Sequence, residues 1–398
     1  MLSERAKNLK PSATLALNAK AQELAKAGRD VISFAVGEPD WDTFDYIKKA
    51  AHDALDAGFT KYTPASGISD LKSAVVDKIK SELGLSYESN QCMVALGAKQ
   101  AIFNALQVLC NPGDEVIVPA PYWVSYPTMI ELADAKPVIP VCPKETQFKL
   151  TPDLLKRTLT AKTKAIILNS PNNPTGQVYS IQELKNIAAV LELTGVWVIS
   201  DDIYDKMIFT GESIAPHIAQ QSEKLRNQVL LVNSVSKTYS MTGWRLGSIV
   251  GDKRVIDACS NYQSQSASCA VGFAQKGAVA ALNGPNDQVG KAMAELANRK
   301  RAAMEALHGI SSLDVLDPMG AFYIWVNISK LFGKTSPSRK EIHNSTDFST
   351  ALLEDQGVAV VPGIEFGTEG FIRMSYTLAM KKMLDGLGRL KKFVESLE

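Results

Sequence analysis

The stretch VWVISDDIY, residues 196–204, sets a short apolar run directly before two carboxylates and a phenol. A short apolar run with polar flanks is typical of a strand that is buried on both faces of a parallel sheet. Ligands of open α/β sheets bind just beyond the carboxyl ends of such strands. The sequence therefore predicts a buried strand that delivers Asp201 and Tyr204 to a binding site.

A second apolar run, Lys164–Leu168, reads as another buried strand and leads into the loop NSPNNPTG at 169–176. Two prolines and a glycine fix the backbone of this loop. Taken alone, the loop favours an ordinary turn rich in Asn and Pro. Because it follows a strand, it also offers Asn173 as a hydrogen-bond donor at a strand end.

Further along the chain, NSVSK at 233–237 and TGWRLG at 242–247 place one lysine between hydroxyls and an arginine. The amine of Lys237 can bond covalently to an aldehyde, while Ser234 and Arg245 can hold a phosphate. Most lysines beside serines are simply solvated, so this segment carries weight only together with the others.

The three segments together supply what pyridoxal phosphate (PLP) requires of a protein. PLP chemistry needs a lysine for the aldehyde, a carboxylate at the pyridine nitrogen and donors at the ring oxygen. Lys237, Asp201, Tyr204 and Asn173 meet these needs. We therefore expect PLP as the cofactor, bonded to Lys237.

In their order along the chain, these segments resemble the fold-type I aminotransferases. The resemblance is to the class I aspartate aminotransferases and to their bacterial subgroup with prephenate-using members. It extends over nearly the whole chain, because matching segments lie at 36–40, 60–64, 97–101, 121–126, 320–323 and 371–376. The order and spacing of so many segments make the resemblance specific.

The resemblance implies a role for each matching residue. Lys237 is expected to be catalytic and to move a proton between the substrate and the cofactor. Ala98 begins a helix whose N-terminus favours a phosphate, and Tyr62 is expected to reach that phosphate from a neighbouring subunit. The expected cofactor-binding residues are Lys237, Asp201, Tyr204, Asn173, Trp123, Ser234, Ser236, Arg245, Ala98, Lys99 and Tyr62. The expected substrate-binding residues are Gly37, Trp123, Asn173, Arg373, Lys99 and Lys10.

The resemblance also implies the substrates, through the roles that it gives to three cationic side chains. Arg373 should bind the α-carboxylate, Lys99 should meet the distal carboxylate of a dicarboxylic substrate, and Lys10 matches a position linked to prephenate use. We expect amino-group exchange between aspartate or glutamate and 2-oxo acids such as 2-oxoglutarate and oxaloacetate, with prephenate as a further acceptor. The alternatives are an aminotransferase of aromatic or neutral amino acids, a β-lyase, and a PLP-sensing regulator. The regulator is disfavoured because residues before Gly37 show no helix-turn-helix pattern.

Composition excludes several other classes. The 398 residues carry a net charge of +1 and no basic block with interleaved aromatics, so we expect no nucleic-acid partner. The histidines are scattered and no Gly-x-Gly-x-x-Gly follows the first strand, which disfavours a metal hydrolase and a nicotinamide dehydrogenase. Five separated cysteines, with no signal peptide and no membrane span, indicate a cytoplasmic protein.

The resemblance to the aminotransferases further implies that the protein is a homodimer whose two subunits share their active sites.

The alternation of strands and helices predicts an α/β fold of two domains. A large PLP-binding domain, residues 46–294, should hold a mostly parallel seven-stranded sheet flanked by helices. A smaller α+β domain should follow it, and the resemblance implies that this domain combines both chain ends, residues 1–45 and 295–398. The expected strands are 93–95, 115–118, 137–141, 164–168, 196–200, 229–232, 246–250, 321–326 and 358–361. The expected helices are 98–110, 123–133, 181–193, an interrupted 255–283, and 288–307.

Overall fold

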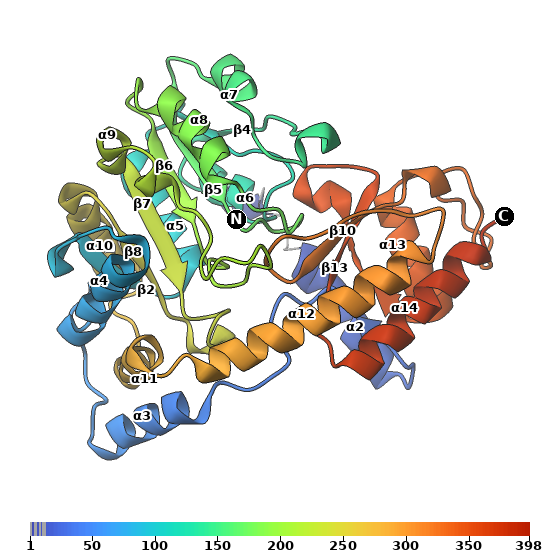
Figure 1. Cartoon of the computed structure of the whole chain (residues 1–398), viewed down its shortest axis with the longest axis horizontal. Helices are drawn as coiled ribbons and strands as arrows, with labels where there is room; N and C mark the ends of the chain where they lie inside the picture. The colour runs from blue at the N-terminus through green and yellow to red at the C-terminus, as the bar shows by residue number, and fades with distance from the viewer. Residues whose placement is uncertain (1, 4–5, 8, 10–12) are drawn as a thin grey trace.

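The computed structural model describes residues 2–3, 6–7, 9 and 13–398, and its centre is a seven-stranded sheet (Figure 1). β8 runs antiparallel to both of its neighbours, and the other neighbouring pairs are parallel. The predicted mostly parallel sheet is therefore confirmed. Across the sheet the order is β2 (Cys92–Ala95), β8 (Gly247–Val250), β7 (Val229–Ser234), β6 (Trp197–Asp201), β5 (Thr163–Asn169), β3 (Glu115–Ile117) and β4 (Lys136–Val138).

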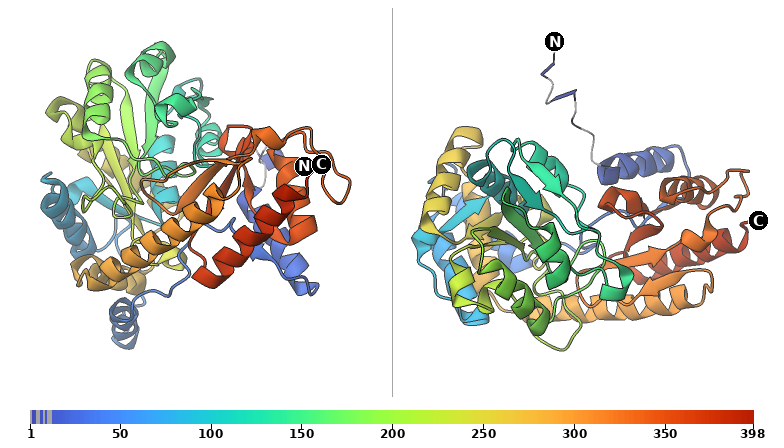
Figure 2. Two further views of the ribbon diagram at one scale, coloured as in Figure 1. Left: turned by 45° about the vertical axis from the view of Figure 1, so that its right-hand side comes forward. Right: turned by 90° about the horizontal axis from the view of Figure 1, so that it is seen from above.

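Helices cover both faces of this sheet because its strands are apolar on both sides (Figure 2). Ile167 and Ile199 pack toward one face, whereas their neighbours Ile166 and Val198 pack toward the other. The first face meets α5 (Ala98–Leu109), α6 (Tyr126–Glu131) and α10 (Lys253–Ser266). The second meets α4 (Ser69–Leu83), α7 (Pro152–Thr158), α8 (Ile181–Leu191) and α9 (Glu223–Arg226). At one end, α3 (Asp45–Asp56) packs against α11 (Gly272–Asn283).

The remaining elements form a second layered part, which α12 (Asp287–His308) joins to the first (Figure 1). Its antiparallel sheet has the order β12 (Val361–Pro362), β13 (Phe371–Ser375), β10 (Tyr323–Asn327) and β9 (Asp314–Leu316). Helices α13 (Ser345–Gln356) and α14 (Met380–Glu395) pack on each other beside it.

The two ends of the chain meet in this second part. β1 (Ile32–Ser33) pairs in parallel with β11 (Val358–Ala359), and Ala21 of α2 (Ala13–Lys26) packs against Leu353. This pairing is what the expected small domain requires. The expected boundaries near residues 46 and 294 stay predictions.

Three expected elements differ from the structure. The helix expected over 123–133 is α6 alone, because residues 123–125 form a turn and Pro127 lies in the first helical turn. The strand expected over 137–141 ends at Val138, two residues before Pro140. The run 358–361 is divided between β11 and β12, which belong to different sheets. None of the helices described here is long and apolar enough to cross a membrane.

Candidate active site

A cavity of about 270 Å³ opens where three neighbouring parallel strands end. Its wall includes Asn169, Asp201 and Ser234, the last residues of β5, β6 and β7. Apart from two, all expected site residues line it: Gly37, Ala98, Lys99, Trp123, Asn173, Asp201, Tyr204, Ser234, Ser236, Lys237, Arg245 and Arg373. Tyr62 does not line the cavity and is 91% exposed. Lys10 lies outside the described residues.

Lys237 follows β7 and is held by a backbone carbonyl from the N-terminal segment. Its Nζ donates a 2.6 Å hydrogen bond to the carbonyl oxygen of Gly37. Burial lowers the pKa of Lys237 to about 8, and the nearby Glu38 carboxylate opposes that shift. A substantial fraction of this amine is therefore neutral near physiological pH, which is the form that can attack an aldehyde or accept a proton.

Asp201 is buried at the end of β6, as expected, and has a partner that the sequence reasoning missed. The Tyr126 hydroxyl donates to Oδ2 of Asp201 at 2.6 Å, and Asn169 Nδ2 donates to the Asp201 carbonyl at 2.9 Å. Burial raises the pKa of Asp201 to about 7, against the Tyr126 hydrogen bond, which lowers it. Tyr126 could have been noticed from its position three residues after Trp123, because residues at this spacing in a helical turn lie on the same side.

The start of α5 and Arg245 form the anion-binding end of the cavity. Gly97 precedes the helix with φ of 90°, and no side chain caps the first turn. A Cβ at Gly97 would lie 2.5 Å from Arg245 Nη2, so only glycine lets the guanidinium come this close. Arg245 Nη1 donates to the Thr242 carbonyl at 2.8 Å, which fixes the guanidinium beside the helix N-terminus.

Two serine hydroxyls complete this end of the cavity. Ser234 Oγ lies 2.6 Å from Ser236 Oγ and 2.8 Å from the Leu246 carbonyl oxygen. The next residue, Gly247, begins β8 and allows the backbones to approach closely, because a Cβ at this position would lie 2.5 Å from the backbone nitrogen of Ala98. The helix N-terminus, Arg245 and both serines thus converge as donors for an anion.

Arg373 projects from β13 and is 2% exposed. It donates to Asn173 Oδ1 at 3.1 Å and to the Ala35 carbonyl at 2.7 Å, while its buried Nε has no partner among the described residues. Burial lowers the pKa of Arg373. The guanidinium is therefore held in place while some of its five N–H donors remain available to bind a carboxylate.

A second tyrosine that lacked an assigned role, Tyr323, joins Arg373 to Tyr204. The two phenol oxygens lie 2.8 Å apart, and the Arg373 guanidinium carbon lies 4.5 Å from the centre of the Tyr323 ring. The segment 320–323 is one of the stretches that match the family, but the sequence does not predict that Tyr323 contacts Tyr204. Burial raises the pKa of Tyr204, so its hydroxyl remains a donor.

Lys99 and Trp123 lie together on another wall. The ammonium of Lys99 is 4.9 Å from the centre of the Trp123 ring. Partial burial and the charge of Arg245 lower the pKa of Lys99. The indole also meets the Tyr126 ring edge to face, with centroids 5.3 Å apart. Trp123 thus packs directly over the residue that holds Asp201.

These groups fit a phosphate-bearing pyridine aldehyde. The cavity combines an anion-binding end, a buried carboxylate for the ring nitrogen, phenol and amide groups for the ring oxygen, and a lysine with a lowered pKa. They do not fit a metal centre. No group of three or more His, Cys, Asp or Glu residues in the described part of the chain could hold a metal ion.

Known proteins share both the sequence and the fold. The family model for aminotransferase class I and II matches residues 29–390. A protein of Rickettsia felis named probable aspartate/prephenate aminotransferase is 44% identical, with 100% of this chain and 97% of that protein covered.

Two solved structures agree with this family. The aspartate aminotransferase of Rhizobium meliloti superposes with a TM-score of 0.96 at 38% identity, over 100% of both chains. The Thermus thermophilus aspartate aminotransferase with maleate gives a TM-score of 0.91 at 37% identity, over 99% of both chains. This chain therefore belongs to the class I and II aminotransferases, and its cofactor is pyridoxal phosphate.

Proposed function

We propose that the cavity holds PLP with its phosphate at the start of α5. Ala98, Lys99, Ser234, Ser236 and Arg245 would bind the phosphate. Asp201 would pair with the ring nitrogen, Tyr204 and Asn173 would donate to the ring oxygen, and Trp123 would cover the ring. The observation that supports this arrangement is that one cavity gathers all of these groups around Lys237.

When bound, PLP supplies an aldehyde for the substrate amine and a ring that accepts electrons from the substrate α-carbon. The protein supplies the proton movements. Lys237, with its lowered pKa, would take a proton from the substrate α-carbon as a neutral base and, as an acid, would deliver it to the former aldehyde carbon of the cofactor. Asp201 holds a proton at the ring nitrogen, and its burial strengthens that interaction.

We further propose that the amino donors are aspartate and glutamate and that the acceptors are their 2-oxo acids. Two cationic side chains, Arg373 and Lys99, line the same cavity as Lys237 and could bind the two carboxylates of one substrate. Names of relatives support this choice, and maleate in the Thermus thermophilus structure is itself a dicarboxylate. Gly37 would contribute its backbone at the substrate side, beside Lys237.

A panel of amino donors and 2-oxo acids, assayed in single turnovers of PLP into its amine form, tests this proposal. Aspartate and glutamate should convert the cofactor fastest, and 2-oxoglutarate and oxaloacetate should restore it. A β-lyase would instead release ammonia and a 2-oxo acid without forming the amine cofactor. Faster conversion by aromatic or neutral amino acids would overturn the dicarboxylate assignment.

Prephenate is proposed as a second acceptor, supported by the aspartate/prephenate name of the Rickettsia felis relative. Lys10 is its proposed contact. Replacing Lys10→Ala should lower prephenate turnover and leave 2-oxoglutarate turnover near the native value. Unchanged prephenate turnover would remove this role of Lys10.

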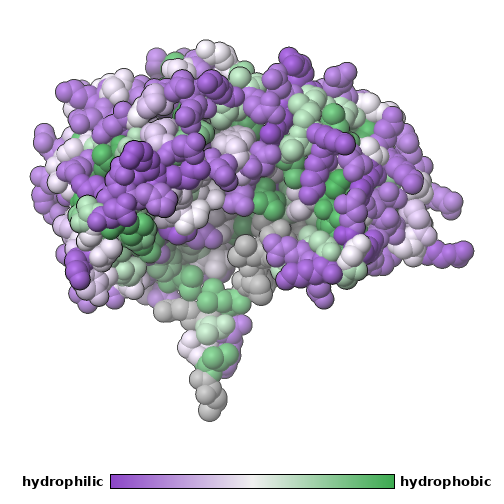
Figure 3. All heavy atoms as spheres, turned by 90° about the horizontal axis from the view of Figure 1, so that it is seen from below, coloured by the Kyte–Doolittle hydropathy of each residue, from purple (hydrophilic) through white to green (hydrophobic). Residues whose placement is uncertain are grey.

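We also propose that the active protein is a homodimer with shared sites. The Tyr62 ring is 91% exposed and does not line the cavity of its own chain, so it is available to reach a partner's cavity. Hydrophobic residues, green in Figure 3, lie along the middle of one face between hydrophilic areas. Such a face suits contact with a second copy.

A reducing, cytoplasmic setting is proposed as well. All five cysteines are free, and burial raises the pKa of Cys92 to about 12 and that of Cys259 to about 12. Buried thiols of this kind behave as small apolar core residues. Full activity of protein purified under strong reducing agent would agree with this setting.

A further inference from the structure

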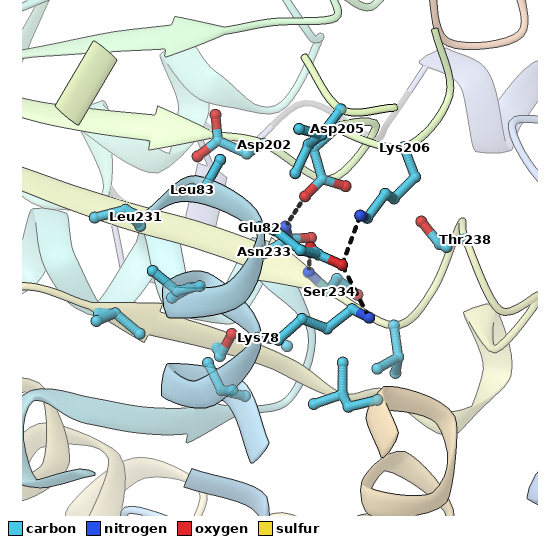
Figure 4. Close-up of a pocket in the computed structure, with 18 of the residues that line it drawn as sticks. Lys78, Glu82, Leu83, Asp202, Asp205, Lys206, Leu231, Asn233, Ser234 and Thr238 are labelled. Atoms are coloured by element: carbon cyan, nitrogen blue, oxygen red, sulfur yellow. Dashed lines mark hydrogen bonds and ion pairs between the residues drawn. The ribbon is translucent and has the colours of Figure 1, made fainter. Parts of the chain in front are cut away.

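A second cavity, of about 90 Å³, lies behind the anion-binding end of the active site (Figure 4). It is bounded by α4, by β7 and by the segment that follows β6. Its walls are largely apolar, with Asp205 and Asn233 among its polar residues. Of the described residues that line either cavity, Ser234 alone lines both. A side chain that lines this second cavity can therefore influence the active site through Ser234.

A continuous hydrogen-bonded path connects Asp205 to the two active-site serines. Asn233 Nδ2 donates to Asp205 Oδ2 at 2.7 Å, and Asn233 Oδ1 accepts from the backbone nitrogen of Ser234 at 2.7 Å (Figure 4). Ser234 Oγ then lies 2.6 Å from Ser236 Oγ. The path ends directly before Lys237. Asp205 fixes which way the Asn233 amide is turned, because an ionised carboxylate only accepts hydrogen bonds and so must face the NH₂ group.

The charges around Asp205 leave Asn233 as its hydrogen-bonded side chain. Lys78 and Lys206 both pair with Glu82, at 3.0 Å and 2.6 Å, on the same side of the cavity (Figure 4). Burial raises the pKa of Asp205 to about 6, and the charge of Lys206 lowers it. At neutral pH the carboxylate is thus mostly ionised, and it turns the NH₂ of Asn233 toward itself and the amide oxygen toward Ser234.

We propose that Asp205 is a positioning residue for the phosphate end of the active site. As a hydrogen-bond acceptor, Asp205 orients the Asn233 amide. The amide oxygen of Asn233 then accepts from the backbone N–H of Ser234 and holds this residue in position. The positions of the Ser234 and Ser236 hydroxyls follow from that bond. Asp205 itself does not touch the cofactor. The inference rests on the proposed binding of the phosphate by Ser234, Ser236 and Arg245.

The test compares PLP with pyridoxal, which lacks the phosphate. Both bond to Lys237, so a change confined to the phosphate end affects only PLP. Dissociation constants are measured by titrating the cofactor-free full-length protein. Asp205→Leu should weaken PLP about tenfold while leaving pyridoxal within about twofold of native. Asp205→Asn should stay close to native, because its amide oxygen can still accept from Asn233.

Two further variants separate the outcomes. Ile79→Val is the control, since Ile79 lines the same cavity but carries no charge that acts on Asp205, and it should leave the affinity for PLP unchanged. Arg245→Ala tests the phosphate assignment itself and should weaken PLP selectively. If Arg245→Ala is selective and Asp205→Leu is not, only the positioning role fails. If Arg245→Ala weakens both compounds equally, the phosphate assignment fails first. Equal losses in Asp205→Asn and Asp205→Leu would also overturn the role of Asp205 as an acceptor.

Discussion

The hydroxyl of Tyr126 donates a 2.6 Å hydrogen bond to Oδ2 of Asp201, although the two residues lie 75 positions apart in the chain. Burial alone would favour the neutral acid, whereas this bond favours the carboxylate. The tyrosine comes from the first turn of α6 and the aspartate from the end of β6. The helix therefore helps set the charge of the group proposed to hold the ring nitrogen.

Tyr126→Phe should raise the pKa of Asp201 further above its value of about 7, because the hydrogen bond to the ionised form is lost. Less Asp201 is then ionised at mildly acidic pH. We expect the variant to lose more PLP affinity, relative to native protein, at pH near ~6.5 than near ~8.5. Tyr122→Phe is the control, since Tyr122 does not contact Asp201. A loss that is equal at both pH values would contradict the mechanism.

The lowered pKa of Lys237 predicts how PLP enters the protein. Only the neutral amine attacks the aldehyde, so the rate of incorporation, followed by visible absorbance, should rise as pH passes through about 8. Glu38→Gln removes a carboxylate that raises this pKa, and it should move the midpoint roughly a few tenths of a pH unit lower. Lys237→Ala should abolish transamination. A midpoint near ~10, the ordinary value of lysine, would show that burial does not act as inferred.

The strands that build the site were predictable because each is a short apolar run with polar residues at its carboxyl end. Asp201 and Asn173 could be placed in one region by this rule alone. Contacts between distant segments could not be predicted in this way. The Tyr204–Tyr323 contact and the hydrogen-bonded path from Asp205 to Ser234 depend on how segments pack together, and no local spacing in the sequence indicates that packing.

The errors in the predicted elements have local causes. Apolar periodicity over 123–133 suggested one long helix, but Pro127 and the turn that presents Trp123 restrict it to six residues. The run 358–361 reads as one strand, yet Val360 separates two short pairings with different sheets. Periodicity reports burial rather than continuity: residues 358–361 are all buried, and the buried residues of 123–133 recur at helical spacing, although neither segment is one continuous element.

Lys99→Ala should lower kcat/KM for aspartate much more than for alanine, which lacks a distal carboxylate. The loss of a charge-assisted pair predicts a difference of about 2 kcal/mol between the two donors. Steady-state assays with both amino acids measure it, and Lys136→Ala, at an exposed residue of β4, serves as the control. Equal losses for both donors would assign Lys99 to the phosphate alone.

Subunit mixing tests whether Tyr62 completes the site of a second copy. The ring is 91% exposed in a single chain and does not line that chain's own cavity, so its hydroxyl should bind phosphate only across an interface. Tyr62→Phe dimers should bind PLP weakly at every site, and Lys237→Ala dimers should form no covalent bond with it. After random exchange of equal amounts, about a quarter of all sites should regain native affinity, because one site of each mixed dimer receives both intact residues. Titration of the mixture with PLP counts these sites. If Tyr62 acted within its own chain, mixing would restore none of them, and a fully active monomer would exclude the shared site altogether.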